Sequence, residues 1–469
     1  MKTTLTQLGQ PGTRYFFCGI GGAGMSPLAH VLAARGMQVG GSDSAMQKTV
    51  AELQAAGVEC HVGHAATHVD RADVFVYSSA IRPDNPEWVR ARERGMPCIH
   101  RAALLALLVN PGRGITIAGT HGKTTTAALA ALLCTQGGLD PTAVIGGYVP
   151  GLNGYHRVGA SDWTVIETDE SDGSFTQFQS AIAVVLNVDR DHLDFYADVD
   201  AISTAFQQYV RGVKPGGTVV YNGDDAPATA VVEAAIRARD IRPIVCRRAR
   251  PADFTAVDAR CDAWSSYFSV VEPDARYEIE LGVPGDHNVT NALHAIAAAR
   301  IAGVTIDAVQ HACREFHGVH RRFERLGHYH GATVIDDYAH HPAEIEATLA
   351  TAARLHARVV VVFQPHRFSR TEKLLDEFAA VLAGIPHVIL TEVFSASEDE
   401  GAVNGVTLAE RVQDRYPGAR YISDLALLPG VLADIVREGD IVLCLGAGSI
   451  SRAAHELVDN VEVGAHERT

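Results

Sequence analysis

The sequence predicts an α/β protein of three domains, and three observations support this prediction. The chain has 469 residues, about three times the ~150 residues that one domain usually contains. Short runs of β-branched residues alternate with alanine-rich segments of helical length, which is typical of parallel sheets covered by helices. Two of these runs enter glycine-rich loops, at residues 19–24 and 119–122. We place the domains at residues 1–110, 111–319 and 320–469, with the first boundary at a Pro-Gly pair.

The first domain is predicted to be Rossmann-like. A strand at residues 14–20 enters the glycine loop, a helix follows at about residues 26–35, and a second strand ends at Asp43. Glycines let the backbone approach a diphosphate, and an acidic residue about 20 positions later commonly binds a ribose hydroxyl. The pattern fits a dinucleotide cofactor such as NAD, another diphosphate, or a purely structural turn. A third strand, at residues 74–77, ends in two serines.

The second glycine loop predicts a nucleotide-binding P-loop domain. An apolar strand at residues 115–117 enters a turn between two glycines, and an alanine-rich helix leaves it at residues 124–133. The N–H groups of such a loop bind a polyphosphate, Lys123 can neutralise its β and γ oxygens, and Thr124 can face Mg²⁺. The match is imperfect, because Ile117 stands where the P-loop pattern has glycine.

Acidic side chains follow two later strands of the same domain. The strand at residues 163–167 leads into the acidic run 168–172, and the strand at residues 181–188 leads into the run 189–194, which contains His192. Since ligands of parallel sheets bind at the carboxyl ends of strands, we expect both runs to converge on the P-loop. Carboxylates and a histidine beside a triphosphate suit Mg²⁺ coordination.

Two asparagines precede the last alanine-rich helix of the central domain. Asn288 and Asn291 stand three residues apart and therefore share one helical face. Their carboxamides can read the edge of an adenine, or they can be ordinary first-turn and capping residues.

The third domain is predicted to be a second Rossmann-like sheet, with strands at residues 333–335, 358–363, 388–390 and 441–445. Two aspartates and two histidines follow its first strand, a set that could suggest a metal. The sequence Pro-Ala-Glu that begins at Pro342 favours a helix start there instead. The arginines of this domain are candidates for contacts with a carboxylate or phosphate.

Composition limits the classes of function. The balance of 40 basic against 55 acidic residues gives a net charge of −15, which disfavours a nucleic-acid binder. Eight cysteines are scattered without a Cys-x-x-Cys pair, as expected of thiols in a reducing compartment. We find no secretory signal and no apolar run of about 18 residues, and therefore expect a cytoplasmic enzyme without membrane insertion.

Together these motifs resemble the Mur ligase family along nearly the whole chain. The segments that carry the resemblance are residues 19–26, 119–126, 167–172, 191–194, 285–288, 321–323, 336–342, 364–367 and 446–449. The resemblance implies that the three domains bind, in chain order, a UDP-sugar, ATP and an amino acid. It further implies an ATP- and Mg²⁺-dependent ligase of peptidoglycan precursor synthesis, which joins L-alanine to the lactyl carboxylate of UDP-N-acetylmuramate through an acyl phosphate. We expect a monomer or homodimer.

The resemblance also implies residue roles, which we state as expectations. ATP is expected at Gly119, Thr120, His121, Gly122, Lys123, Thr124, Thr125, His287, Asn288, Asn291 and Asp337. The UDP-sugar is expected at Gly19, Ile20, Gly21, Gly22, Ala23, Gly24, Met25, Asp43, Ser78 and Ser79. The metal is expected at Thr124, Glu167 and His192, and the amino acid at Arg321, Tyr338, His340 and His366. The catalytic residues are expected to be Lys123, Glu167, His192 and Arg321.

One departure and several alternatives bear on these expectations. Sibling ligases that add later residues carry a carbamylated lysine shortly after this histidine, whereas no lysine occurs from Leu193 to Val213. This difference favours the alanine-adding branch and leaves the second metal without that ligand. A recycling ligase that attaches a whole tripeptide to the same sugar nucleotide is the alternative within the family. A nucleotide-binding regulatory protein and an NAD-dependent dehydrogenase are the alternatives outside it.

Overall fold

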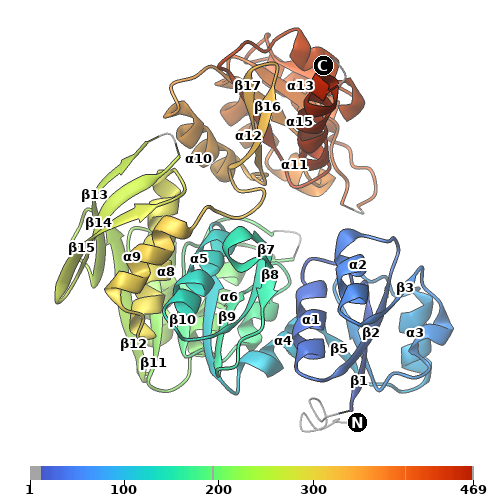
Figure 1. Ribbon diagram of the computed structural model, residues 1–469, viewed down its shortest axis with the longest axis vertical. Coiled ribbons are helices and arrows are strands. Elements are labelled where there is room, and N and C mark those ends of the chain that lie inside the picture. Colours follow the sequence, from blue (N-terminus) through green and yellow to red (C-terminus); the bar gives the residue numbers. More distant parts are fainter. Residues whose placement is uncertain (1–11, 193–194, 263, 397, 467–469) are drawn as a thin grey trace. The chain divides into compact units, whose positions relative to one another are not determined.

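A computed structural model describes residues 12–192, 195–262, 264–396 and 398–466 of the chain. It contains three sheets, each with its own helices (Figure 1). The chain divides into two compact units: residues 1–257, 269–278 and 290–316 belong to the first, and the remainder belongs to the second. Within the described residues, no helix combines the length and apolarity needed to cross a bilayer.

The N-terminal sheet has five parallel strands in the order β3-β2-β1-β4-β5. These strands are β1 (Arg14–Cys18), β2 (Gln38–Asp43), β3 (Glu59–Val62), β4 (Val74–Tyr77) and β5 (Cys98–His100). The helices are α1 (Ser26–Ala34), α2 (Lys48–Ala55), α3 (Pro86–Glu93) and α4 (Arg101–Val109). Strand order reverses between β1 and β4, and ligands of such sheets bind at the carboxyl ends of strands at this reversal. The first glycine loop directly follows β1 and lies at that position.

The central sheet has ten strands in the order β15-β14-β13-β12-β11-β10-β6-β9-β7-β8. The strands are β6 (Arg113–Ala118), β7 (Thr142–Val149), β8 (Gly154–Arg157), β9 (Trp163–Glu167), β10 (Ile182–Val185), β11 (Gly217–Asn222), β12 (Ile241–Arg248), β13 (Phe254–Cys261), β14 (Ser266–Glu272) and β15 (Ala275–Leu281). The helices are α5 (Lys123–Gln136), α6 (Val199–Arg211), α7 (Ala226–Ile236), α8 (Asp286–Ile301) and α9 (Ile306–Glu315). Since β6 is hydrogen-bonded in parallel to both β9 and β10, the carboxyl ends of these three strands meet at one edge.

The C-terminal sheet has six strands in the order β16-β17-β21-β18-β19-β20, and only the β16–β17 pair is antiparallel. The strands are β16 (Glu324–Tyr329), β17 (Ala332–Asp337), β18 (Val359–Phe363), β19 (Val388–Thr391), β20 (Arg420–Ile422) and β21 (Ile441–Leu445). The helices are α10 (Pro342–Ala353), α11 (Phe368–Lys373), α12 (Leu375–Ala383), α13 (Gly405–Gln413), α14 (Leu428–Ala433) and α15 (Ile450–His466). Every residue of β21 is buried, as expected of a central parallel strand with helices on both faces.

The predicted fold class of three α/β parts is confirmed. The strands expected at residues 74–77, 163–167 and 441–445 occur with those bounds as β4, β9 and β21. The strand expected at residues 181–188 was too long, because β10 ends at Val185 and the residues after Leu186 leave the sheet to hold the P-loop.

Candidate active site

The backbone of the loop between β6 and α5 requires glycine at two positions. Gly119 has φ 146° and Gly122 has φ 82°, both in the region that favours glycine. A Cβ at Gly119 would lie 2.9 Å from the Cβ of Leu186, and one at Gly122 would collide with the carboxamide of Asn291. Gly122 is also the left-handed N-cap of α5. The loop backbone therefore lies at the N-terminus of α5, where no side chain caps the helix. Such a terminus is a favourable place for phosphate oxygens.

The end of β10 holds this loop in place through Asn187. The Asn187 side chain accepts a hydrogen bond from the His121 N–H at 2.8 Å and donates one to the His121 carbonyl at 3.0 Å. Two residues later, the N–H of Asp189 donates to Thr120 Oγ1 at 2.9 Å, and its carboxylate lies 3.1 Å from His121 Nε2. The loop conformation is therefore fixed by an element distant in sequence. Nothing in the sequence marks Asn187 for this role, although it lies at the strand end that the sequence indicates.

Lys123 begins α5 and folds back over the loop. Its Nζ donates hydrogen bonds to the carbonyls of Gly119 at 2.6 Å and Thr120 at 3.0 Å, and to Glu170 Oε1 at 2.7 Å. Burial lowers the pKa of Lys123, but the carboxylates of Glu170, Glu167 and Asp169 together raise it by more, so that the pKa lies above its ordinary value. The ammonium group is thus fully charged at neutral pH and anchored beside the backbone of the phosphate loop.

Oxygen atoms of two elements meet next to Lys123 at positions that suit a magnesium ion. Thr124 Oγ1 donates to Glu167 Oε1 at 2.8 Å, and Glu167 Oε2 accepts from the N–H of Gly146 at 2.7 Å. Hydroxyl and carboxylate oxygens are the ligands that Mg²⁺ prefers, usually together with substrate phosphates and water. The donor set therefore fits the expected ion, with Thr124 at the helix start and Glu167 at the end of β9.

Glu170 connects Lys123 with His192. Glu170 is 2% exposed, and its Oε1 lies 2.7 Å from Lys123 Nζ and 3.5 Å from His192 Nε2. Its Oε2 is buried and has no hydrogen-bond partner among the described residues. His192 has φ 55°, in the left-handed region that few residues other than glycine adopt, although histidine is among those found there more often. From the sequence we noted the acidic run that contains Glu170 but assigned this residue no role.

The first glycine loop is held by the end of β2. The N–H groups of Gly19 and Ile20 both donate to the Ser42 carbonyl at 2.8 Å. The Gly21 N–H donates to Asp43 Oδ2 at 2.9 Å, and Asp43 is 5% exposed. In this state Asp43 therefore orders the loop itself, and its expected contact with a ribose stays a prediction.

Two contacts within the first unit connect this loop region with the acidic run after β9. Arg101, at the start of α4, approaches Gly24 so closely that a Cβ there would lie 3.0 Å from its Nη1. The same guanidinium donates to Asp169 Oδ2 at 2.7 Å. Burial raises the pKa of Asp169, but Arg101, the hydrogen bonds from Ser171 and the charge of Lys123 together lower it by more. Ser79 Oγ also donates to Asp172 at 3.3 Å.

Asn288 and Asn291 both lie in the first turns of α8. Asn291 faces Gly122 of the P-loop, within the first unit. In the second unit, Asn288 Nδ2 donates to the Pro284 carbonyl at 2.6 Å, and burial lowers the pKa of His287 to about 4, which leaves the ring neutral. The Asn288 carboxamide thus binds the turn that precedes α8, and its expected contact with adenine stays a prediction.

Asp337 ends β17 and fixes the turn that follows. It accepts hydrogen bonds from the N–H groups of Phe323 at 2.8 Å and Ala339 at 2.7 Å. Burial raises the pKa of Asp337 to about 6. Nearby, His341 is the N-cap of α10, in a capping box with Glu344. The helix start predicted from Pro342 is therefore confirmed.

Arg321, Tyr338, His340 and His366 form one cluster in the second unit. The guanidinium carbons of Arg321 and Arg322 each lie 4.8 Å from the ring centre of Tyr338. The Tyr338 and His340 ring centres are 5.1 Å apart, and those of His340 and His366 are 5.7 Å apart. Arg321 Nε is buried without a hydrogen-bond partner among the described residues. The structure therefore brings together the four residues expected to bind an amino acid.

Comparisons with known proteins agree on one family. Three family profiles match in sequence: the Mur ligase family catalytic domain at residues 14–113, the Mur ligase middle domain at residues 117–299, and the Mur ligase glutamate ligase domain at residues 321–448. A UDP-N-acetylmuramate–L-alanine ligase of Geotalea daltonii is 41% identical over 461 residues, which cover 96% of this chain and 98% of that protein. The protein of the same name from Salinibacter ruber is 42% identical over 452 residues, which cover 95% of this chain and 94% of that protein.

A solved structure agrees with these sequence relatives. The crystal structure of UDP-N-acetylmuramate–alanine ligase from Thermotoga maritima is 30% identical in sequence and superposes with a TM-score of 0.81. The match covers 96% of this chain and 99% of that one.

Proposed function

The chain belongs to the Mur ligase family, and on that premise we propose that it joins L-alanine to the lactyl carboxylate of UDP-N-acetylmuramate while ATP is converted to ADP and phosphate. Full-length relatives named for this reaction, at 41% and 42% identity, support the proposal. The observation that carries the chemistry is the meeting of Lys123, Thr124, Glu167 and His192 at one edge of the central sheet.

The P-loop is the proposed ATP site. The N–H groups between Gly119 and Thr125 face the β- and γ-phosphates, and Lys123 offsets the charge of the transferring phosphoryl group. Lys123 is already charged and positioned by Glu170, so little rearrangement of the site is needed in the transition state. His287, Asn288 and Asn291 are the proposed neighbours of the adenine, and Asp337 is the proposed neighbour of the ribose.

Thr124 and Glu167 would hold Mg²⁺ at the phosphates, and His192 would hold a second ion nearer to the reacting carboxylate. When bound, the ion at Thr124 and Glu167 would offset negative charge on the phosphoryl oxygens. The chain's own contribution is geometric: the Glu167 carboxylate is fixed by the Gly146 N–H on one oxygen and by the Thr124 hydroxyl on the other. Oriented carboxylates of this kind set where a hard cation binds.

The proposed chemistry has two steps. The lactyl carboxylate attacks the γ-phosphorus of ATP, and ADP leaves, which gives an acyl phosphate. The neutral amine of L-alanine then attacks the acyl carbon, a tetrahedral intermediate forms, and phosphate leaves as the amide bond is completed. Both steps depend chiefly on positioning and on offsetting negative charge. Lys123 acts in the first step.

The two substrates that the new bond joins are assigned to the N-terminal and C-terminal parts of the sequence. The loop from Gly19 to Met25, with Asp43, Ser78 and Ser79, is the proposed UDP-N-acetylmuramate site. Arg321 is the proposed partner of the alanine carboxylate, and Tyr338, His340 and His366 wall off the space beyond its side chain. Because the nucleotide substrates are found in the cytoplasm, we propose that the protein is cytoplasmic.

Release of phosphate tests the proposed function. We expect release only when UDP-N-acetylmuramate, L-alanine and ATP are all present, and we expect the sugar nucleotide to gain one alanine residue by mass. Release of phosphate from ATP without the sugar nucleotide, at the same rate as with it, would contradict the proposal.

A further inference from the structure

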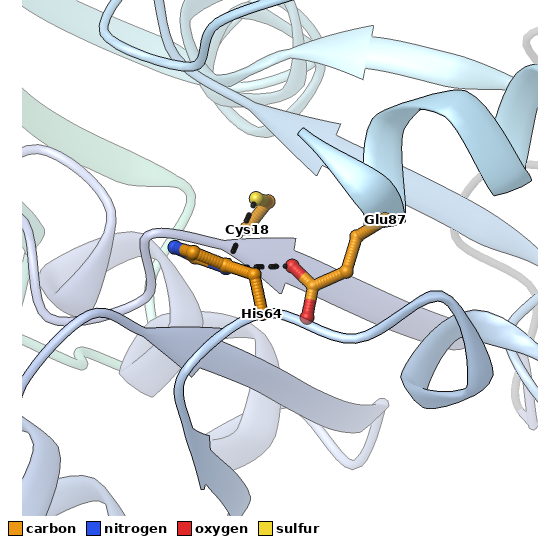
Figure 2. Close-up of side chains that lie close together, drawn as sticks. All are labelled: Cys18, His64 and Glu87. Carbon is orange, nitrogen blue, oxygen red and sulfur yellow. Dashed lines mark hydrogen bonds and ion pairs between the residues drawn. The ribbon is translucent and has the colours of Figure 1, made fainter. Parts of the chain in front are cut away.

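Three side chains of types that can ligate a metal meet in the N-terminal part of the chain, and the proposed reaction makes no use of them. Figure 2 shows Cys18, His64 and Glu87 with their side chains turned toward one another. Cys18 ends β1, His64 follows β3, and Glu87 lies in the first turn of α3. Cys18 and Glu87 are fully buried, and the His64 side chain is 24% exposed. The cluster is thus closed on the side of the sheet and reachable at His64.

The three ligand atoms lie at distances that suit coordination of one ion. Cys18 Sγ is 3.9 Å from His64 Nδ1, and His64 Nδ1 is 3.0 Å from Glu87 Oε2. All three atoms lie within 4.8 Å of one another. Tetrahedral zinc sites, with bonds of about 2.0 to 2.3 Å, separate their ligand atoms by roughly 3.3 to 3.7 Å. The Cys18–His64 separation is slightly longer than this range, and the His64–Glu87 separation is slightly shorter. Side-chain shifts of a few tenths of an ångström would therefore bring these atoms to coordination distances.

The charge of Glu87 supports a cation at this place. Its partners are neutral donors or histidines: the Ser42 hydroxyl donates to Oε2 at 2.6 Å, and His68 Nδ1 lies 2.8 Å from Oε1. Among the described residues, no lysine or arginine forms an ion pair with it. A buried carboxylate is costly unless it is paired or coordinates a metal.

We propose that Cys18, His64 and Glu87 bind one divalent cation of the zinc class, with water as a fourth ligand. The thiol proton leaves to solvent, the His64 ring keeps its proton on Nε2, and the Glu87 carboxylate coordinates through Oε2. A cation of charge +2 with one thiolate and one carboxylate gives a neutral site, which is the charge that burial favours. Sulfur and imidazole ligands select zinc-like ions over Mg²⁺ and Ca²⁺.

The surroundings provide a second set of contacts, as established metal sites do. His68 and Ser42 orient the Glu87 carboxylate, and such partners fix the direction of a ligand and tune affinity. The ring of His61 stacks on that of His68, with centres 4.2 Å apart. The Ser42 carbonyl also accepts hydrogen bonds from the N–H groups of Gly19 and Ile20, so the site adjoins the first glycine loop. The proposal rests on these side chains and does not require the proposed function.

Cobalt(II) is the probe that distinguishes this site, because a thiolate ligand gives it an intense near-ultraviolet absorption. The experiment titrates Co²⁺ into the reduced, metal-free full-length protein, with Mg²⁺ in excess to saturate oxygen-ligand positions. We expect this absorption to saturate at one equivalent and to be reversed by Zn²⁺. Cys18→Ser and His64→Gln should each abolish it, whereas Cys98→Ser, a half-buried thiol control in the same sheet, should retain it.

His68→Gln gives an independent readout, since it changes a partner of Glu87 and leaves the three ligands intact. We expect it to keep the thiolate absorption but to weaken Co²⁺ binding about 10- to 100-fold. Zn²⁺ should also raise the unfolding temperature of the wild type, and should not raise that of Glu87→Gln. Absence of the thiolate band in the wild type, or a band that survives in both Cys18→Ser and His64→Gln, would overturn the proposal.

Discussion

The Nζ atom of Lys123 lies 2.7 Å from Oε1 of Glu170. The lysine comes from the start of α5 and the glutamate from the loop after β9, so the contact joins the P-loop to a neighbouring strand end. Glu170 is almost fully buried, and its charge keeps Lys123 protonated despite burial. A buried carboxylate thus sets both the position and the charge of the cation that we assign to the transferring phosphoryl group.

Replacement of Lys123 tests the proposed ATP site. Lys123→Ala removes one preorganised charge from the phosphoryl transition state, so kcat should fall at least about 100-fold while the fold is retained. Steady-state phosphate release and circular dichroism check this expectation. Lys373→Ala, at an exposed position in α11, is the matched control and should keep wild-type turnover. Near-normal turnover in folded Lys123→Ala would show that this loop is not the site of phosphoryl transfer.

Glu170 is predicted to act through Lys123. Glu170→Gln keeps the shape but removes the charge, so we expect kcat to fall about 10-fold or more. The double variant Lys123→Ala/Glu170→Gln should be no slower than Lys123→Ala alone, because contacting residues with one shared role are not additive. Glu233→Gln, an exposed position on α7, serves as control. Losses that multiply in the double variant would show that Glu170 acts independently of the lysine.

Activity is predicted not to depend on carbon dioxide. The chain has no lysine between Lys123 and Lys214, and Lys214 Nζ donates to the Gly112 carbonyl at the opposite, amino end of β6. No lysine of this stretch is therefore available beside His192 to form a carbamate. Phosphate release should be unchanged when CO₂ and bicarbonate are depleted at fixed pH. A loss of activity that bicarbonate restores would contradict this expectation.

His366 is predicted to limit stability in acid. Burial, aided by the nearby charges of His340 and Arg370, lowers its pKa to about 3. Because an unfolded histidine binds a proton below pH ~6.5, this contribution to stability is complete above that pH and is lost as pH falls toward 3. The loss can reach about 1.4 kcal/mol per pH unit.

His366→Phe keeps the ring stack with Phe394 but cannot bind a proton. We expect its unfolding temperature to fall less than that of the wild type between pH 7 and pH 4, measured by scanning fluorimetry. His330→Gln, at an exposed position, is the control and should follow the wild type. Parallel pH curves for wild type and His366→Phe would contradict the assignment of a neutral, half-buried ring.

The fold and the backbone parts of the site could be predicted because they depend on local sequence. Gly119, Gly122 and Lys123 stand together in the chain, and their strand–loop–helix context is visible in the residue pattern. The polar runs after β9 and β10 could likewise be expected to meet, since parallel strands end at the same edge, and His192 of the second run lies 3.5 Å from Glu170 of the first.

Contacts that depend on side-chain direction could not be predicted. Asp43 accepts a hydrogen bond from the N–H of Gly21, a contact that the sequence does not indicate. Asn187 and Glu170 stand in runs of polar residues where nothing in the sequence indicates which side chain turns inward. Only the folded strand ends show that Asn187 holds the loop and that Glu170 reaches Lys123.

The choice of amino acid tests the central claim most directly. The measurement is kcat/KM with UDP-N-acetylmuramate and ATP for L-alanine, glycine, L-serine and the tripeptide L-alanyl-γ-D-glutamyl-diaminopimelate. The proposed amino-acid site at Arg321, Tyr338, His340 and His366 predicts that L-alanine is best and that glycine and L-serine are about 10- to 200-fold poorer. The tripeptide should not be used. Preference for the tripeptide would assign the chain to the recycling reaction, and no ATP cleavage with any of the four would contradict a ligase.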